Sequence, residues 1–488
     1  MSALAADLLF RPIAEIGRAL RAKKVSPQAL VETSLERLEK IGRSLNAVVT
    51  LAGEEALAQA RDAEKDLGRG HSRGPLFGIP WGAKDLLATR GMPTTWGAAP
   101  YREQRFDEDA TVVRRLRDAG AILTAKLSMV ELAGGMGYNN ADASFTGPGL
   151  NPWNRAHWSG GSSSGPGSAV AAGLVSFAIG SETVGSILTP SAFSGVTGLR
   201  PTYGRVSRHG AMALSWTLDK LGPMARTAED CAIVLRAIEG PDPRDPTAAA
   251  SMPVTPAAAG KKRLVTRRLR VGVPKGADKY MQEEVAANFR EAIAILERFA
   301  DVRRDVTLPD FPYGFCTGSI VAAEGASAFI DLIEGGRLRE LKARADRVGG
   351  YANAMVPAVD YLHAMRLRGK MREPFAALYE KYDVLVAPAR DTVANPIGID
   401  FDKAFPDVGK DRPQGWVSAT GVLIQAGNLL GLPALCLPDG FGQSGLPTAI
   451  QLVAAPFRED HLFSLGAEYQ RRTSFHTRRP AETSPPFS

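Results

Sequence analysis

The stretch Trp158–Gly198 constrains the fold more than any other part of the chain. It contains two clusters of serine and glycine, Gly160–Ser164 and Ser181–Ser186, separated by small and apolar residues. Between them, Ser168–Gly173 is rich in alanine and closes on a glycine, where helices often end. Leu174–Ile179 is apolar enough for a buried strand. The pattern predicts a helix followed by a strand, with each cluster at an element boundary, where unpaired N–H groups can face a ligand.

Predicted helices and strands alternate along the rest of the chain. Residues 109–120 have the spacing of a helix with Val112, Val113 and Leu116 on its buried face, and a strand is predicted directly after it. Late in the chain, residues 432–438 and 448–454 have the pattern of paired strands joined by a glycine-rich turn. Alternation of this kind is typical of an α/β/α sandwich, and the late hairpin predicts that its central sheet is mixed.

The length of 488 residues is compatible with one large unit, and the 44% hydrophobic content can fill a sizeable core. The best linker candidate is the Pro-, Ala- and Arg-rich stretch before residue 269. We expect a single domain over 1–480, made of a core over 70–240, a linker-like loop over 241–268, a mostly helical excursion over 269–380 and a return to the core over 381–480, followed by a disordered tail over 481–488.

Three cysteines lie far apart and in no C-x-x-C pattern, which is typical of a reducing compartment and predicts no metal site. The N-terminal apolar run contains Asp7 and lacks a basic region, so we expect no signal peptide. No apolar stretch reaches the roughly 20 residues that a membrane span needs. These features predict a cytoplasmic protein that does not bind membranes.

The net charge of +7 is mild for this length, but six basic residues gather in Lys261–Arg270. Such a run can bind nucleic acid. No aromatic residues interleave with it, and it follows the linker candidate. These two features favour a solvated linker end over a nucleic-acid interface.

Two motif matches lack the structural context that their chemistry needs. Gly161-x-Ser163-x-Gly165 has the form of a nucleophile elbow, but no apolar strand precedes it. The glycines that start at Gly440 have the spacing of a dinucleotide fingerprint, but a β-like segment follows them instead of a helix. The six histidines are scattered without a metal-ligand spacing. We therefore expect neither a cofactor nor a metal.

The serine clusters strongly resemble the amidase signature family, which joins a G-G-S-S-G-type turn to a G-S-[DE]-T-x-G-S turn. Ser162 and Ser186 occupy the two serine positions, and Lys84 occupies the lysine position of the family's G-[IV]-P-x-x-x-K-D segment. The resemblance implies an α/β/α sandwich around a large, mixed, mostly parallel sheet. It also implies that Ser186 is the nucleophile, that Ser162 follows a cis peptide bond and relays the proton, and that neutral Lys84 is the base. Apolar neighbours such as Trp81 would favour the neutral amine.

The resemblance further implies that backbone N–H groups around Thr183, Val184, Gly185 and Ser186 hold the oxyanion, and that the loop beginning near Ala133 lines the substrate pocket. The sequence departs from the commonest family form. Val184 replaces a residue that is usually small, Glu182 replaces an aspartate, and Leu188 replaces a frequent arginine; Ser164 and Pro166 also differ. A β-branched residue at position 184 would be strained at a positive φ.

The resemblance predicts a serine amidohydrolase that cleaves a small or medium neutral amide, with an anilide, ester or carbamate left open. We expect a small-molecule substrate, no nucleic acid and no membrane, and we leave a homodimer open. An alternative within the family is the A subunit of a tRNA-dependent amidotransferase, which hydrolyses glutamine to deliver ammonia and needs another protein as its partner. A third alternative is a non-catalytic nucleic-acid-binding protein that uses the basic run.

Overall fold

The computed structural model describes residues 3–249 and 267–481, and its centre is an eleven-stranded sheet. The strands follow the order β1-β3-β2-β6-β8-β7-β12-β13-β11-β9-β10, and β4 and β5 form a separate hairpin. The strands are β1 (Val48–Leu51), β2 (Pro80–Lys84), β3 (Ile122–Leu127), β4 (Leu150–Asn151), β5 (Asn154–Trp158), β6 (Phe177–Glu182), β7 (Thr197–Arg200), β8 (Lys220–Ala225), β9 (Arg270–Pro274), β10 (Asp301–Val306), β11 (Val384–Pro388), β12 (Ala434–Phe441) and β13 (Pro447–Ala454).

The sheet is mixed, as the late hairpin predicted. β2 pairs in parallel with both β3 and β6, and β9 pairs in parallel with both β10 and β11. Between these two groups, every neighbouring pair of strands is antiparallel, in the order β6, β8, β7, β12, β13 and β11. The hairpin of β12 and β13 is inserted between β7 and β11, so a late part of the chain completes the middle of the sheet.

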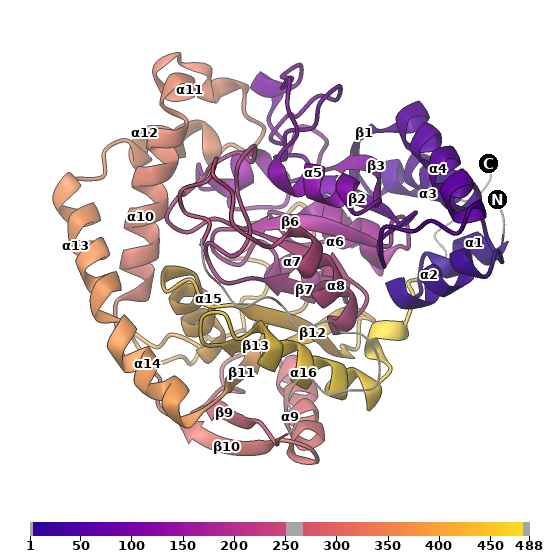
Figure 1. Ribbon diagram of the computed structural model, residues 1–488. Helices are drawn as coiled ribbons and strands as arrows, with labels where there is room; N and C mark the ends of the chain where they lie inside the picture. Colours follow the sequence, from indigo (N-terminus) through magenta and orange to yellow (C-terminus); the bar gives the residue numbers. More distant parts are fainter. Residues whose placement is uncertain (1–2, 250–266, 482–488) are drawn as a thin grey trace.

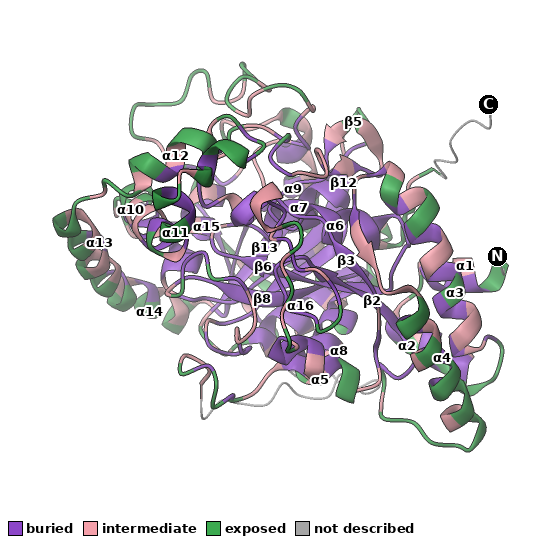
Figure 2. Ribbon diagram, turned by 90° about the horizontal axis from the view of Figure 1, so that it is seen from above, coloured by how far each residue is buried: buried purple, intermediate pink, exposed green. Residues whose placement is uncertain are grey.

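Helices cover the sheet and make the expected α/β/α sandwich, which is confirmed (Figure 1). Figure 2 shows the buried strands inside and the exposed helical surfaces outside. The α-helices are α1 (Ala3–Leu8), α2 (Ile13–Arg21), α3 (Pro27–Arg37), α4 (Gly53–Gly68), α5 (Thr111–Asp118), α6 (Ser164–Ala171), α7 (Leu188–Ser194), α8 (Ala228–Ile238), α9 (Glu283–Glu297), α10 (Tyr313–Ala328), α11 (Ile330–Glu334), α12 (Asp346–Asn353), α13 (Ala358–Lys370), α14 (Arg372–Lys381), α15 (Ala419–Leu429) and α16 (Glu459–Arg471). Short turns of other helical types are η1 (Leu38–Gly42), η2 (Ala99–Tyr101), η3 (Glu131–Gly134), η4 (Arg337–Glu340) and η5 (Phe475–Thr477).

The segment between the two serine clusters folds as a helix and then a strand, with shifted boundaries. α6 begins at Ser164, inside the first cluster, and the apolar residues Leu174 and Val175 precede the strand instead of opening it. One reason is that the carbonyl oxygen of Leu174 accepts a hydrogen bond from the Ser34 hydroxyl at 2.6 Å and so points away from the sheet. The two clusters therefore flank α6 and β6.

Two segments have a structure that their sequence pattern does not indicate. The residues from Val130 have the composition of a helix, but they form only a single 3-10 turn, η3, because Leu132 and Ala133 adopt positive φ values of 49° and 56°. β10 was not expected, since its sequence DVRRDV is polar and largely exposed. It pairs with β9 at an edge of the sheet, where polar side chains are tolerated.

The segment expected to be a linker joins two parts of one sheet. Strands β1–β8 precede it and β9–β13 follow it, which supports our proposal of a single domain over 1–480. Residues 250–266 of that segment and residues 482–488 of the expected disordered tail lie outside the described residues.

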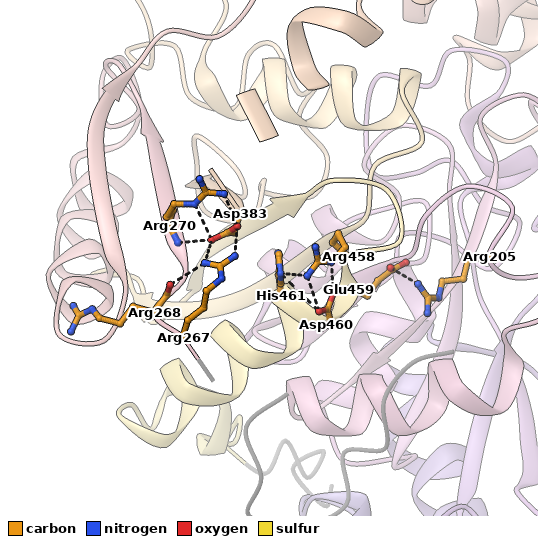
Figure 3. Close-up of polar contacts among 9 residues, drawn as sticks. All are labelled: Arg205, Arg267, Arg268, Arg270, Asp383, Arg458, Glu459, Asp460 and His461. Atoms are coloured by element: carbon orange, nitrogen blue, oxygen red, sulfur yellow. Dashed lines mark hydrogen bonds and ion pairs between the residues drawn. The ribbon is translucent and has the colours of Figure 1, made fainter. Parts of the chain in front are cut away.

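Within the basic run, the described arginines are engaged in contacts inside the fold (Figure 3). Arg267 and Arg270 form ion pairs of 2.6 and 3.1 Å with Asp383, the residue before β11, and Arg268 donates to the carbonyl oxygen of Ala300 at 2.8 Å. These contacts fix the start of β9 beside β11. Residues 261–266 of the run lie outside the described part of the chain.

Candidate active site

Lys84 is the last residue of β2, and its ammonium lies inside the protein between the two serine clusters. Its Nζ donates hydrogen bonds of 2.7 Å to Ser162 Oγ and 2.8 Å to Ser181 Oγ. The peptide bond between Gly161 and Ser162 is cis, as the family resemblance implied. The structure therefore brings Lys84 and Ser162 together, and it adds Ser181, which the sequence pattern did not single out.

Burial lowers the pKa of Lys84 to about 7, against the opposing effects of the Asp219 and Glu182 carboxylates. A buried ammonium loses its hydration, so the neutral amine is favoured. Near neutral pH, a substantial fraction of Lys84 is thus unprotonated and able to accept a proton from a hydroxyl.

Ser186 lies in the turn between β6 and α7, and its backbone contacts Ser163, the residue after Ser162. The two clusters touch through the backbone, since the N–H of Ser163 donates to the carbonyl oxygen of Ser186 at 3.3 Å. The hydroxyl of Ser186 makes no hydrogen bond to another of the described residues, and 9% of the residue's surface stays exposed. Of the two serines, Ser186 is therefore the one that can face an incoming carbonyl.

Glu182 holds the turn between β6 and α7 through hydrogen bonds to the backbone that follows it. Its Oε2 accepts hydrogen bonds from the N–H groups of Ile187 and Leu188 at 2.8 and 3.0 Å. Its Oε1 forms a 2.9 Å ion pair with Arg200, and both side chains are fully buried. Burial works to raise the pKa of Glu182, but Arg200 and Lys220 outweigh it and lower that pKa. The glutamate found in place of the family's aspartate thus supports the start of α7.

The turn offers unpaired donors where the family's oxyanion site is expected. Within the described chain, the N–H groups of Val184, Gly185 and Ser186 form no backbone or side-chain hydrogen bond. Gly185 has a φ of +88°, whereas Val184 is not among the residues with a positive φ, so the strain considered for Val184 does not arise. Thr183 is held by its hydroxyl, which donates to Asp219 Oδ1 at 2.6 Å.

A cavity of about 210 Å³ opens beside these groups. Its lining includes Ala133, Ser181 and Thr183, together with Arg208 and Trp216. The N–H of Ala133 donates to the carbonyl oxygen of Val130 at 3.0 Å, so Ala133 borders the cavity with its side chain and offers no free donor.

Buried charges that the sequence pattern did not reveal surround the site. Asp219 accepts hydrogen bonds from the N–H groups of Leu214 and Ser215, and Lys220 donates to Asn428 at 2.6 Å. Burial raises the pKa of Asp219 and lowers that of Lys220. No local sequence motif marks them, because their partners come from distant segments.

Two further observations concern ligands and membranes. Among the residues that the structure describes, no group of three or more histidine, cysteine or acidic side chains is placed to hold a metal ion. No helix in residues 3–249 and 267–481 combines the length and apolar character that a membrane crossing requires. The three cysteines are buried and unpaired.

The half-buried Val184 side chain packs against the core next to the turn. We predict that Val184→Gly shifts preference toward bulkier substrates by about 10-fold, the change expected for removing a few methyl groups from a pocket wall. Relative kcat/KM across acyl and leaving groups of increasing size measures this shift. Unchanged ratios across the series would mean that the valine side chain does not limit the substrate.

Comparisons with known proteins agree over nearly the whole chain. The model of the Amidase family matches residues 29–463. The A subunit of the glutamyl-tRNA(Gln) amidotransferase of Moorella thermoacetica is 37% identical over 97% of this chain and 99% of its own length. The structure of the native peptide amidase from Stenotrophomonas maltophilia has a TM-score of 0.83 and 29% identity, covering 97% of this chain and 99% of its own. The structure of the A subunit of the glutamyl-tRNA(Gln) amidotransferase from Thermotoga maritima has a TM-score of 0.75 and 27% identity, covering 93% and 94%.

These relatives overturn the partners expected from the sequence. We expected a small-molecule amide or related acyl substrate and no nucleic acid, and we left a homodimer open. The relatives are instead named as one subunit of an amidotransferase for glutamyl-tRNA(Gln). The expectation that the only partner is a small-molecule substrate is therefore wrong.

The family match over residues 29–463 agrees with the mixed sheet and with the buried lysine between the two Ser/Gly turns. This chain therefore belongs to the amidase signature family of serine amidohydrolases.

Proposed function

We propose that this chain is the glutamine-hydrolysing A subunit of a tRNA-dependent amidotransferase. The observation that carries the proposal is the 37% identity to such a protein over 97% of this chain and 99% of the relative. The similarity therefore extends over nearly the full length of both chains. We also propose that the protein works in the cytoplasm, where charged tRNA is used.

In this proposal, Ser186 is the nucleophile. Its Oγ attacks the side-chain carbonyl carbon of glutamine, while Ser162 takes the proton from Ser186 and passes its own to neutral Lys84. The Lys84–Ser162 hydrogen bond of 2.7 Å supports this relay. The developing oxyanion is held by the free N–H groups of Val184, Gly185 and Ser186, with Thr183 beside them.

The tetrahedral adduct then breaks its C–N bond, and the proton on the lysine–serine relay goes to the leaving nitrogen, which departs as ammonia. A water molecule attacks the resulting ester on Ser186 and gives up its proton to the same relay. The ester C–O bond then breaks, and the relay returns that proton to the Ser186 oxygen. The products are glutamate, ammonia and the free enzyme, so atoms and charges balance. In an amidotransferase, the ammonia is passed on to the charged tRNA.

A second candidate is the hydrolysis of an amide at the end of a peptide. It is favoured by the higher TM-score of the peptide amidase, 0.83, compared with 0.75 for the A subunit from Thermotoga maritima. The two candidates share the same nucleophile and relay and differ in the substrate beyond the reacting amide.

The test is ammonia release by the purified chain from glutamine, from an amidated peptide and from a chromogenic anilide. Each assay is run with and without the other subunits of the Moorella thermoacetica enzyme. We expect release from glutamine that depends on Ser186, and amide transfer to glutamyl-tRNA once the other subunits are added. Release from the amidated peptide alone, with glutamine inert under every condition, would support the second candidate. A chain that turns over none of these substrates but retains RNA in a binding assay would point to the non-catalytic alternative.

A further inference from the structure

The turn at residues 130–134 contacts Ser162 directly. The N–H of Val130 donates a 3.1 Å hydrogen bond to the carbonyl oxygen of Ser162, the residue that touches Lys84. Three residues later, Ala133 borders the cavity. Leu132 and Ala133 both have positive φ values, a conformation that non-glycine residues adopt only when surrounding contacts enforce it. The position of this turn therefore affects both Ser162 and the cavity.

Glu131, in the middle of the turn, is 1% exposed and is held by a segment far away in the sequence. Its two carboxylate oxygens accept hydrogen bonds of 2.8 Å from the N–H groups of Lys342 and Ala343. Farther along the same segment, α12 packs on the residues after the turn. Asn353 donates to the carbonyl oxygen of Gly135 at 2.9 Å, and a side chain at Gly349 would collide with the Met136 backbone.

Asp346, the first residue of α12, is fully buried beside Glu131. Neither of its carboxyl oxygens meets a donor in hydrogen-bonding geometry within the described part of the chain. Its neighbour is the carboxylate of Glu131, which is itself an acceptor. Two carboxylates can be joined only by a proton, and leaving both ionised side by side in a buried site is strongly unfavourable.

We propose that Asp346 is protonated and donates to Glu131, and that this carboxyl pair positions the 130–134 turn against Ser162. Both acids are positioning residues, since neither touches the reacting atoms. Through the pair, the helical segment at 337–353, which lies outside the central sheet, fixes the geometry of the active site (Figure 1). The proposal deepens the proposed hydrolase function and rests on it for its kinetic consequences.

The electrostatics of the site agree with a shared proton. Burial, together with the hydrogen bond and charge of Glu131, raises the pKa of Asp346 to about 9. The N–H of Tyr138, which lies outside good hydrogen-bonding geometry, acts in the opposite direction. The nearby cation of Lys342 is turned toward Asp142, 3.4 Å away, and is 48% exposed. The proton is therefore held at neutral pH and lost in alkaline solution.

The kinetic test compares Asp346→Asn with Asp346→Ala, using the rate at which a fluorophosphonate modifies Ser186. Asparagine keeps the shape and supplies an N–H donor in place of the carboxyl O–H, but it cannot ionise, so we expect labelling close to the wild-type rate. Alanine removes the donor and leaves Glu131 with only its two backbone hydrogen bonds. Misplacement of the turn by about 1 Å should then slow labelling by about 100-fold. Glu334→Gln, which changes an exposed acid at the end of α11, just before this segment, is the matched control and should change nothing.

The pH profile separates this role from mere packing. Wild-type labelling should fall as the pH rises through about 9, where Asp346 ionises, and Asp346→Asn should lack that fall. Equal rates for the alanine variant and the wild type, or the same alkaline fall in the asparagine variant, would overturn the proposal.

A stability measurement keeps the inference testable even if no hydrolase activity is found. Because the folded pKa of Asp346 lies above its unfolded value of 3.8, its contribution to stability is full at low pH and is lost as the pH rises toward about 9. The midpoint of thermal unfolding of Asp346→Asn should therefore rise relative to that of the wild type as the pH increases from about 4 to about 9. A constant difference over that range would show that Asp346 is ionised in the folded protein, whatever the enzyme does.

Discussion

Replacing Ser186 by alanine should abolish turnover and covalent labelling together. The expected loss of kcat is about 10⁶-fold, as in other serine hydrolases without their nucleophile. The reason is that the hydroxyl of Ser186 is the free one, whereas that of Ser162 is bound to Lys84 at 2.7 Å. Mass spectrometry of the fluorophosphonate adduct, with peptide mapping, identifies the modified serine.

Substitutions at neighbouring serines provide the comparisons that identify the nucleophile. Ser162→Ala should reduce turnover severely while leaving Ser186 open to slow labelling. Ser164→Ala is the matched control, because its hydroxyl makes only a 3.5 Å contact with the Ser128 carbonyl oxygen. An adduct found on Ser163 or Ser164 would show that the nucleophile has been assigned to the wrong residue.

Replacing Lys84 by arginine should be nearly as harmful as replacing it by alanine, with losses of about 10²–10⁴-fold at every pH where the fold survives. Arginine keeps a positive charge but cannot give up its proton in this range, so it cannot serve as the base. The wild-type rate should rise with pH through about 7, where Lys84 becomes neutral, and then level off until other groups titrate. Profiles of kcat/KM against pH measure both effects.

A second buried lysine provides the control for Lys84. Lys126, on the adjacent strand β3, forms a 3.0 Å ion pair with Asp85 and is also fully buried. Lys126→Arg should lower stability without moving the rise in rate near pH 7. If Lys84→Arg kept most of the activity and the wild-type pH profile, the lysine would have a structural role, and the base would have to be sought among other residues.

The contact between Lys84 and Ser162 could be anticipated from the sequence because both residues lie in short motifs of a recognisable family. They are 78 positions apart, and the family pattern, not local periodicity, connects them. Helix caps were also predictable, since they depend on a few adjacent residues. Ser26 caps α3 by accepting from the Ala29 N–H at 3.1 Å, with Pro27 in the first helical position.

The parts of the site that could not be predicted depend on contacts between segments that are distant in the sequence. Glu131 and Asp346 are ordinary acids in the sequence, and only the fold places them together. The same holds for Asp219, whose charge influences Lys84. The turn at Leu132 has helix-favouring residues, but tertiary contacts impose a positive φ on it. The macromolecular partners implied by the names of the relatives could not be derived either, because contacts between subunits do not form a short sequence motif.

The place of the last hairpin in the sheet has a consequence for synthesis of the protein on the ribosome. β7 and all three residues of the proposed relay lie in the first 200 residues, but β12, the strand that pairs with the open side of β7, begins at Ala434. Until that strand has emerged, the nascent chain presents an unpaired edge at Thr197–Arg200, only a few residues after α7. Unpaired edges of this kind invite association with other chains. The amino-terminal half should therefore depend on chaperones until translation is nearly finished.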